Sequence, residues 1–173
     1  MREEVSFFVP GIPKPAGSKR GFVLQRPGMK PRAIITDDCK TSKDWKADVK
    51  AFARQRVTNV ILPLHGPLVL DVLFVMPRPK SHYRTGRHAS ELRPDAPLFH
   101  TSKPDATKLL RCVEDAMTGI IWNDDAQVSQ QAVAKMYGPQ PGASIKVRHC
   151  IFDNPPSETR VRQAEAINQG VAT

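Results

Sequence analysis

The stretch that decides the fold reads LVLDVLFVM and spans Leu68–Met76. Asp71 is its one charged residue, and Gly66-Pro67 and Pro77 bound it on its two sides. A nearly continuous apolar run of this length, bounded by such residues, favours a strand over a helix. We therefore expect Leu68–Met76 to be a central strand of the core sheet.

Four other segments have the pattern of strands. Val5–Val9 is a short apolar run that Pro10 ends, and Ala33–Thr36 predicts a brief strand. Residues 128–136 and 145–151 alternate between apolar and polar side chains, and a Gly- and Pro-rich turn separates them. We therefore expect these last two strands to form a hairpin.

Two segments have the periodicity of amphipathic helices. The first is predicted to begin near Lys43, after Thr41 or Ser42 as its cap, because its apolar residues then share one face. These residues are Trp45, Val49, Phe52 and Ala53. The second is predicted from Pro104 to Gly119, with Ser102 as cap and Asp105 in its first turn. Strands and helices together predict an α/β (α+β) fold with a small mixed sheet and two main helices.

The chain length of 173 residues fits one domain. We assign residues 1–152 to that domain and expect residues 153–173, which have little apolar content, to form a flexible tail. Within the domain, residues 77–104 are rich in proline, lysine and arginine and predict a long irregular loop. This loop is either a mobile arm that grips DNA or a disordered segment.

The charge points to a polyanionic partner. Lys and Arg number 26 against 17 acidic residues, which gives a net charge of +9. Such an excess neutralises phosphates, so nucleic acid is the leading partner, although a merely soluble basic protein has the same composition. Residues 13–32, a predicted loop or edge hairpin, display many of these cations for contact with a DNA backbone or with water. The aromatic content of 6% argues against a surface built on base stacking.

Cysteine usage and the absence of long apolar runs bear on the location of the protein. Cys39, Cys112 and Cys150 are widely spaced and form no CxxC pair, so neither a disulfide framework nor a zinc ribbon is indicated. The first residues lack a signal-peptide pattern, and no run approaches the roughly 18 apolar residues of a membrane helix. We expect a cytoplasmic protein.

Two acidic positions are candidates for chemistry. Asp105 lies at a predicted helix start, and Asp124-Asp125 lie in a polar turn after that helix. Carboxylate oxygens are ligands for hard cations such as Mg²⁺. An acid at a helix N-terminus also stabilises the helix dipole, and an Asn-Asp-Asp turn is ordinary turn chemistry. From residue types alone, a metal site and a purely structural role both stay open.

Three sequence blocks resemble the signature of RusA-type endonucleases. They are KPDATKLLR (residues 103–111), DAMTG (115–119) and WNDDAQV (122–128). The family pattern is roughly K-P-D-x-D-N-L-x-K, then D-A-L-x-G, then D-D-x-Q-[VI], and the blocks follow it in order. The strand that begins at Val5 is also similar to the family's opening. Three blocks in order are far more specific than any one of them.

The resemblance implies a small, intertwined α/β homodimer that recognises Holliday junctions and other branched DNA by shape. It implies paired phosphodiester hydrolysis with Mg²⁺, for which Mn²⁺ can substitute, in recombination and repair within a bacterial or phage-infected cell. Asp105 and Asp125 would be catalytic metal ligands, with Asp124 as a third ligand or a neighbouring acid. Arg111 falls on the position of the family's catalytic lysine and would stabilise charge on the phosphate.

Two residues depart from the family pattern. Thr107 stands in place of the second aspartate of D-x-D, and Lys108 in place of asparagine. Loss of a carboxylate weakens Mg²⁺ binding, although the Thr107 hydroxyl can still position a water as part of the catalytic set. The alternative function is therefore a non-catalytic branched-DNA-binding protein of the same fold. An RNA-binding or assembly protein would need only the basic charge and would leave the aspartates unexplained.

Further residues have predicted supporting roles. Asp115 lies four residues after Arg111, a spacing that permits a helix ion pair worth about 0.3–0.5 kcal/mol, and we favour a structural role for it. The predicted DNA contacts are basic residues of the first segment, the long loop and the second helix. They are Lys14, Lys19, Arg20, Lys80, Arg84, Arg87, Lys103 and Lys108.

Overall fold

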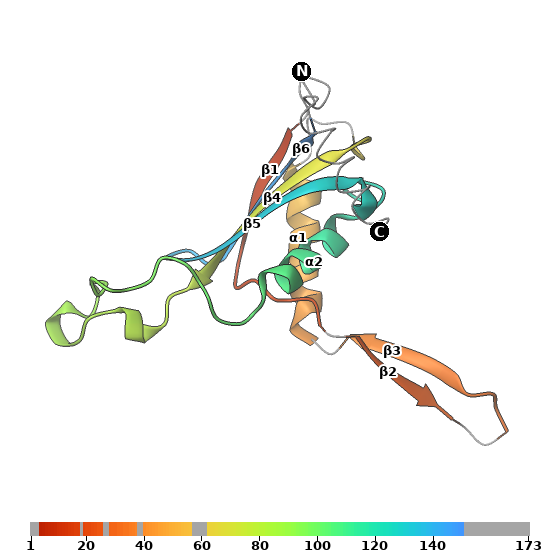
Figure 1. Cartoon of the computed structure of the whole chain (residues 1–173), viewed down its shortest axis with the longest axis horizontal. Coiled ribbons are helices and arrows are strands. Elements are labelled where there is room, and N and C mark those ends of the chain that lie inside the picture. Colours follow the sequence, from red (N-terminus) through yellow and green to blue (C-terminus); the bar gives the residue numbers. More distant parts are fainter. Residues whose placement is uncertain (1–3, 18, 26–27, 38–39, 57–61, 151–173) are drawn as a thin grey trace, which may run out of the picture.

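The computed structural model describes residues 4–17, 19–25, 28–37, 40–56 and 62–150. Within these ranges lie six strands and two α-helices, labelled in Figure 1. The strands are β1 (Glu4–Pro10), β2 (Lys19–Leu24), β3 (Arg32–Asp37), β4 (Leu68–Pro77), β5 (Val128–Gly138) and β6 (Gly142–His149). The helices are α1 (Lys40–Arg56) and α2 (Ala106–Met117). Three short 3-10 helices are η1 (Lys80–His82), η2 (Gly86–His88) and η3 (Asp125–Gln127).

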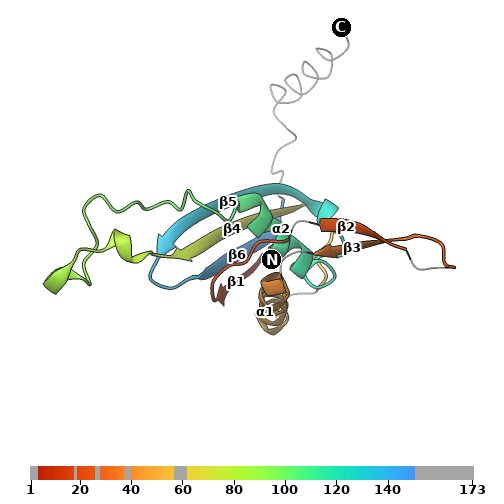
Figure 2. The ribbon, with the colours of Figure 1, turned by 90° about the horizontal axis from the view of Figure 1, so that it is seen from below.

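A mixed four-stranded sheet forms the centre of the molecule, with the order β1-β6-β4-β5. β4 runs antiparallel to β6 and parallel to β5. Both helices lie on one face of this sheet (Figures 1 and 2). The alternation along β4 matches this arrangement, since Leu70, Val72 and Phe74 are buried in the core. The predictions of an α+β fold and of an inner strand at residues 68–76 are confirmed.

The predicted hairpin between the last two strands is wrong. β6 lies between β1 and β4 and pairs with both, while β5 pairs with the other edge of β4. The burial patterns explain the difference, because β6 alternates between buried and exposed residues whereas most of the first half of β5 is exposed, as suits an edge strand. A parallel β4–β5 pair also needs a crossover connection, and α2 supplies it.

The turn between β5 and β6 therefore passes the end of β4 instead of closing a hairpin. Its glycines permit this close approach. A Cβ atom at Gly142 would lie 2.5 Å from the carbonyl oxygen of Val9, and one at Gly138 would lie 2.5 Å from a methyl carbon of Val75. Gly142 is thus needed for the close approach of two backbones, and Gly138 leaves room for the Val75 side chain.

Both helix starts differ from the predictions. α1 begins at Lys40, so Thr41 and Ser42 lie within its first turn and do not cap it. Ser42 is 0% exposed, and its carbonyl oxygen lies 4.0 Å from the sulfur of Cys112 on α2, so tertiary packing extends the helix. α2 begins at Ala106 with Asp105 as its N-cap, in place of Ser102. The predicted stop at Gly119 is confirmed, since this residue follows the helix with a φ of +76°.

β2 and β3 form a separate two-stranded sheet, which we call the hairpin. It projects from the body of the molecule (Figures 1 and 2). The prediction of a loop or edge hairpin in residues 13–32 is only partly met, because β2 lies in this range but its partner β3 spans Arg32–Asp37, and the pair does not join the edge of the core sheet. The brief strand predicted at Ala33–Thr36 is part of β3 and pairs only with β2 among the described strands.

Residues 78–99, which we call the arm, extend on the side opposite the hairpin (Figures 1 and 2). The predicted irregular excursion is confirmed, and it contains η1, η2 and a bridge between Tyr83 and Leu92. At its base, the Tyr137 ring packs against the rings of His82 and His100, with centroids 4.7 and 4.9 Å away. Burial lowers the pKa of His100 and favours its neutral form.

The remaining predictions about the chain concern membranes and the tail. No helix among the described residues is long and apolar enough to cross a membrane. The predicted flexible tail at 153–173 and the side chain of Cys39 lie outside the described residues. Cys112 is buried, and Cys150 is partly buried.

Candidate active site

Asp105 presents an exposed carboxylate at the start of α2. Its backbone carbonyl accepts the first helical hydrogen bond, from Leu109 N at 3.1 Å, but its side chain makes no capping bond. The side chain is exposed and forms an ion pair with Lys108, whose Nζ lies 3.8 Å from Oδ2. The positive end of the helix dipole stabilises negative charge at this position. Asp105 can therefore bind a cation without loss of a helix cap.

Two contacts fix the backbone on either side of Asp105. Lys135 on β5 donates from Nζ to the carbonyl oxygens of Ser102, at 2.9 Å, and Pro104, at 2.6 Å. The carbonyl of Lys108 accepts a hydrogen bond from Ala16 N at 2.8 Å. Sequence reasoning missed the role of Lys135, for which the only signal was a charged residue in an otherwise mostly uncharged strand.

A hollow of about 500 Å³ lies beside Asp105. Three of the predicted DNA-binding residues line it, namely Lys14, Lys103 and Lys108. Lys14 reaches it from the segment after β1, whereas Lys103 precedes α2 and Lys108 lies in its first turn, so the fold brings together cations distant in sequence. Cations around a hollow of this kind suit a phosphate group.

The second acidic group lies in η3, beyond the other end of α2. Asp124 caps this turn, because its Oδ1 accepts a hydrogen bond from Ala126 N at 2.9 Å. Gln127 completes a capping box by accepting from Asp124 N, and its Nε2 donates to the Leu64 carbonyl at 3.0 Å. Gln127 thereby ties the turn to the chain before β4. Asp125 is exposed, and its side chain is left for a ligand.

Glu114 on α2 belongs to the same acidic group. It is half-buried, and its Oε1 accepts a hydrogen bond from Gln131 Nε2 at 2.5 Å. Burial raises the pKa of Glu114, and the negative charges of Asp125 and Asp115 raise it further. Sequence reasoning missed this carboxylate because it falls between the three blocks that resemble the family signature. Its position beside the apolar stripe of the second helix was the signal that could have found it.

The predicted ion pair between Arg111 and Asp115 does not form. Asp115 Oδ2 instead pairs with Lys46 Nζ on α1 at 2.6 Å, which links the two helices. The packing of α1 against α2 places Lys46 nearer to Asp115 than Arg111, which lies one helical turn earlier. This pairing agrees with a structural role for Asp115. Arg111 and Thr107 are both exposed on α2.

The structure does not bring Asp105 and Asp125 together within one chain. Asp105 and Glu114 are nine residues apart along the helix, which corresponds to about 13 Å of rise. On β5, Lys135 lies near Asp105 and Val128 directly follows η3, and seven residues of strand correspond to about 23 Å. Among the described residues, no three His, Cys, Asp or Glu side chains form a group that could hold a metal ion. The candidate carboxylates of the described residues thus form two separate acidic groups, Asp105 at the start of α2 and Glu114, Asp124 and Asp125 at its far end.

The donor types nevertheless suit magnesium. Mg²⁺ prefers oxygen ligands and is often held by one or two carboxylates together with water and phosphate oxygens. The Asp105 end of α2 offers one carboxylate, and the other end offers Asp125 and Glu114, with Asp124 beside them. The oxygen donors fit Mg²⁺ chemically. Because the two sets of carboxylates lie at opposite ends of α2, they cannot bind the same ion within one chain.

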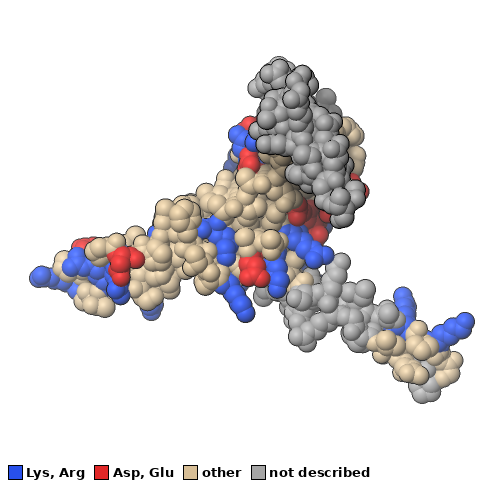
Figure 3. Space-filling view, viewed as in Figure 1, with Lys and Arg blue, Asp and Glu red and all other residues tan. Residues whose placement is uncertain are grey.

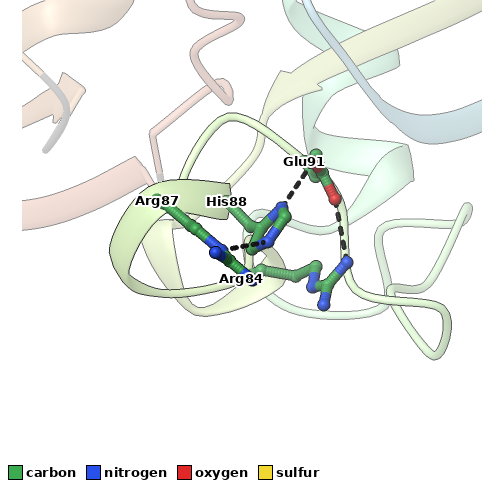
Figure 4. A network of polar contacts seen from close by, with 4 residues as sticks. All are labelled: Arg84, Arg87, His88 and Glu91. Carbon is green, nitrogen blue, oxygen red and sulfur yellow. Dashed lines mark hydrogen bonds and ion pairs between the residues drawn. The ribbon is translucent and has the colours of Figure 1, made fainter.

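The predicted DNA contacts in the arm lie apart from α2. Figure 4 shows that Arg84 pairs with Glu91, with 2.8 Å between the nitrogen and the carboxylate oxygen. His88 bridges Glu91 and Arg87, at 2.7 and 3.0 Å. Glu91 thus offsets part of the charge of Arg84, whereas Lys80 remains an exposed cation. Figure 3 shows blue Lys and Arg side chains on the arm, on the hairpin and on the body between them.

The last two predicted contacts, Lys19 and Arg20, lie on β2 of the hairpin. Their side chains lie outside the described residues. Of the eight predicted cations, the structure therefore groups Lys14, Lys103 and Lys108 around Asp105.

Comparison with known proteins agrees with this arrangement of blocks. The chain is 31% identical over 144 residues to the uncharacterized protein YqaN of Bacillus subtilis (strain 168). That match covers 83% of this chain and 95% of the relative. The sequence model of the family described as Endodeoxyribonuclease RusA matches residues 14–148, which include both acidic groups, the hairpin and the arm. The chain therefore belongs to the RusA family of endodeoxyribonucleases.

Proposed function

We propose that this protein is a Mg²⁺-dependent endonuclease that resolves Holliday junctions and related branched DNA by paired phosphodiester hydrolysis. Its cellular role would be recombination and repair in the cytoplasm of a bacterial or phage-infected cell. One observation carries the proposal. The Asp105 carboxylate makes no helix-capping hydrogen bond and lies beside a hollow lined by three lysines, in a chain of an endodeoxyribonuclease family. Such a site combines a cation ligand with groups that bind phosphate.

The residues would divide the work as follows. Asp105 and Asp125 would be the cation ligands, with Asp124 or Glu114 as a further carboxylate beside Asp125. Mg²⁺, or Mn²⁺ in its place, neutralises phosphate charge and lowers the pKa of an attacking water. Lys14, Lys103 and Lys108 bind the DNA phosphates near Asp105.

Two exposed residues of α2 would complete the catalytic set. Arg111 stabilises the negative charge that develops on the scissile phosphate, and its guanidinium stays protonated throughout. The Thr107 hydroxyl, two residues after Asp105, would orient a water at this end of α2 by hydrogen bonding.

The proposed partner is a four-way junction bound by a homodimer. Two cuts in a two-fold symmetric junction require two equivalent active sites, which a two-fold dimer supplies. The arm, with Lys80, Arg84 and Arg87, and the hairpin, with Lys19 and Arg20, extend on opposite sides of the body and would follow separate DNA arms.

A second candidate function is binding of branched DNA without cleavage. Thr107 favours it, because a hydroxyl replaces a carboxylate that the family pattern has, and fewer negative ligands weaken Mg²⁺ binding. Such a protein would still bind junctions in preference to linear duplexes, with strong dependence on salt.

Incubation of a synthetic four-way junction with the full chain and Mg²⁺ tests both candidates. We expect paired nicks that Asp125→Asn and Asp105→Asn each reduce by roughly 100-fold or more, since each removes a charged metal ligand. Circular dichroism of the variants controls for folding. Junctions that the wild type binds but leaves intact, in Mg²⁺ and in Mn²⁺, would refute catalysis and support the second candidate.

A further inference from the structure

The segment that leads from the arm to Asp105 first follows the edge of β5. Tyr137 N on this strand donates a hydrogen bond to Leu98 O at 2.9 Å. His100 N then donates to Lys135 O at 3.1 Å. Beyond His100 the chain leaves the strand and turns toward α2 (Figure 1). The carbonyl groups of this turn therefore need other partners, either side chains or water.

The side chain of Lys135 is the partner of two of these carbonyl groups. Its Nζ donates to Ser102 O at 2.9 Å and to Pro104 O at 2.6 Å. An ammonium group has three donors, and hydrogen bonds from a charged donor are stronger than those between neutral groups. Lys135 thus continues, with its side chain, the attachment that its backbone carbonyl begins at His100. The residue directly before Asp105 is thereby fixed relative to β5.

The direction of the Asp105 carboxylate depends on this backbone. Its side chain is exposed and makes no capping hydrogen bond, and its ion pair with Lys108 joins two exposed groups 3.8 Å apart. An exposed ion pair of this kind contributes little to position. The backbone carbonyl of Asp105 accepts from Leu109 N at 3.1 Å. The helix therefore holds this residue on one side, and Lys135 holds it on the other.

We propose that Lys135 is a positioning residue of the active site, which fixes the backbone before Asp105 so that the carboxylate is already placed to bind the cation. This inference rests on the proposed function, in which Asp105 is a cation ligand. Lys135 acts through the backbone of its neighbours and touches neither the cation nor the phosphate. Loss of a group that orients a metal ligand typically lowers metal affinity or activity by roughly 10–100-fold.

A contact with a DNA phosphate is the alternative role for this lysine. Lys135 is half-buried and its ammonium is directed at two carbonyl oxygens, whereas Lys103 and Lys108 are exposed. Burial, with a further contribution from the charge of Lys135, lowers the pKa of His100. The adjacent imidazole therefore stays neutral and adds no second cation for a phosphate to bind. Both observations favour the positioning role.

Three variants of the full chain provide the test. Lys135→Met removes the ammonium and keeps an unbranched side chain, and Lys135→Arg keeps the charge and the donors. Lys146→Met is the matched control, because it removes the same charge from β6, where Lys146 pairs with Glu4 at 2.8 Å. Lys146 alternates with the buried Ile145 and Val147, so it lies on the face of the sheet opposite the helices.

Hydrogen exchange of the Leu109 amide, followed by NMR without metal, reports on the backbone of Asp105 directly. We expect faster exchange of this amide in Lys135→Met than in the wild type, in Lys135→Arg or in Lys146→Met. Water can reach the carbonyls of Ser102 and Pro104 once the ammonium is gone, so the variant should fold. Circular dichroism and the melting temperature check this expectation.

Electron paramagnetic resonance of bound Mn²⁺ and metal-free binding of a four-way junction complete the test. We expect Lys135→Met to lower Mn²⁺ affinity by roughly 10–100-fold and Lys135→Arg to retain most of it. Junction binding should change no more in Lys135→Met than in Lys146→Met. A larger loss of junction binding would make Lys135 a phosphate contact and overturn the inference.

Two further results separate this inference from the proposed function. If the wild type binds Mn²⁺ and Lys135→Met binds it equally well, with unchanged Leu109 exchange, Lys135 does not position Asp105 and only this inference fails. If the wild type binds no Mn²⁺ and leaves junctions intact, the proposed function fails and Lys135 has no role toward a cation. The Leu109 amide then still shows whether Lys135 holds the backbone.

Discussion

Thr107 is exposed on the first turn of α2, two residues after Asp105. We expect Thr107→Asp to tighten Mg²⁺ binding by roughly tenfold, since the charge of the ligands largely sets the affinity for a hard cation. Calorimetric titration with Mg²⁺ and the nicking rate at limiting Mg²⁺ measure the effect. Thr107→Asn is the control, because it adds an oxygen ligand without charge. If Thr107→Asp and Thr107→Asn have the same Mg²⁺ affinity and nicking rate, the missing carboxylate is not what limits Mg²⁺ binding by this chain.

Glu114 gives a prediction about pH. The pKa of Glu114 is raised in the folded protein above 4.5, so the folded state holds this proton more tightly than the unfolded chain does. Stability is therefore lost as pH rises from the unfolded pKa through the folded one, and the loss is complete above it. Without metal, Glu114→Gln should match the wild type in melting temperature at pH 3 and exceed it at pH 7.

Asp48→Asn is a suitable control for that measurement, because Asp48 is exposed on α1. It should shift the melting temperature less than Glu114→Gln between the same two pH values. If Glu114→Gln changes the melting temperature equally at both pH values, packing and not ionisation accounts for the change. Mg²⁺ should stabilise the wild type more than Glu114→Gln if this carboxylate binds the cation.

At the scale of elements, local pattern predicted β4 and the apolar faces of both helices. The apolar run of residues 68–76 and the helical spacing of residues such as Val49 and Val113 each reflect burial against the sheet. The order of the strands in the sheet could not be predicted from local sequence pattern. Residues 128–136 and 145–151 have the spacing of a hairpin, and only the competition for the edges of β4 separates them.

The candidate site was predictable in part for a similar reason. Asp105, Asp124 and Asp125 lie in blocks that resemble a family signature, so sequence sufficed to select them. Lys135 and Glu114 act through contacts with residues 17 to 33 positions away, namely Gln131, Ser102 and Pro104, and no local pattern encodes those contacts. The separation of the two acidic groups follows from the length of α2 and required the fold.

The arm can be tested as an element. Its base is held to β5 by the hydrogen bonds from Tyr137 N to Leu98 O and from His100 N to Lys135 O, at 2.9 and 3.1 Å. Replacement of residues 80–96 by a short Gly-Ser linker leaves these bonds in place, so we expect a folded protein with weaker junction binding. The slope of log K against log salt should become less steep by about 0.9 for each phosphate that the protein no longer neutralises. An unchanged slope would exclude the arm from the DNA interface.

At the scale of the whole molecule, two extensions leave the body in opposite directions, and both display basic residues (Figures 1 and 3). The net charge of +9 is spread over these extensions and the surface between them. A charge distributed over so wide a surface suits a ligand that is itself branched, because several duplex arms can be bound at once. The same shape leaves the hairpin with little contact to its own chain.

The hairpin therefore gives the prediction about assembly. Val23→Asp combined with Met29→Asp should convert the proposed homodimer to monomers, because full burial of each such apolar side chain contributes about 1.5–3 kcal/mol and a two-fold interface repeats the loss. Sedimentation velocity should show a dissociation constant raised by at least roughly 100-fold, since every 1.4 kcal/mol is a factor of ten. Junction nicking should fall with the dimer fraction. Leu92→Asp on the arm, where Leu92 is 44% exposed, is the control and should remain dimeric. If the double variant stays dimeric, the hairpin does not pack against the second copy, and its role would be to bind DNA.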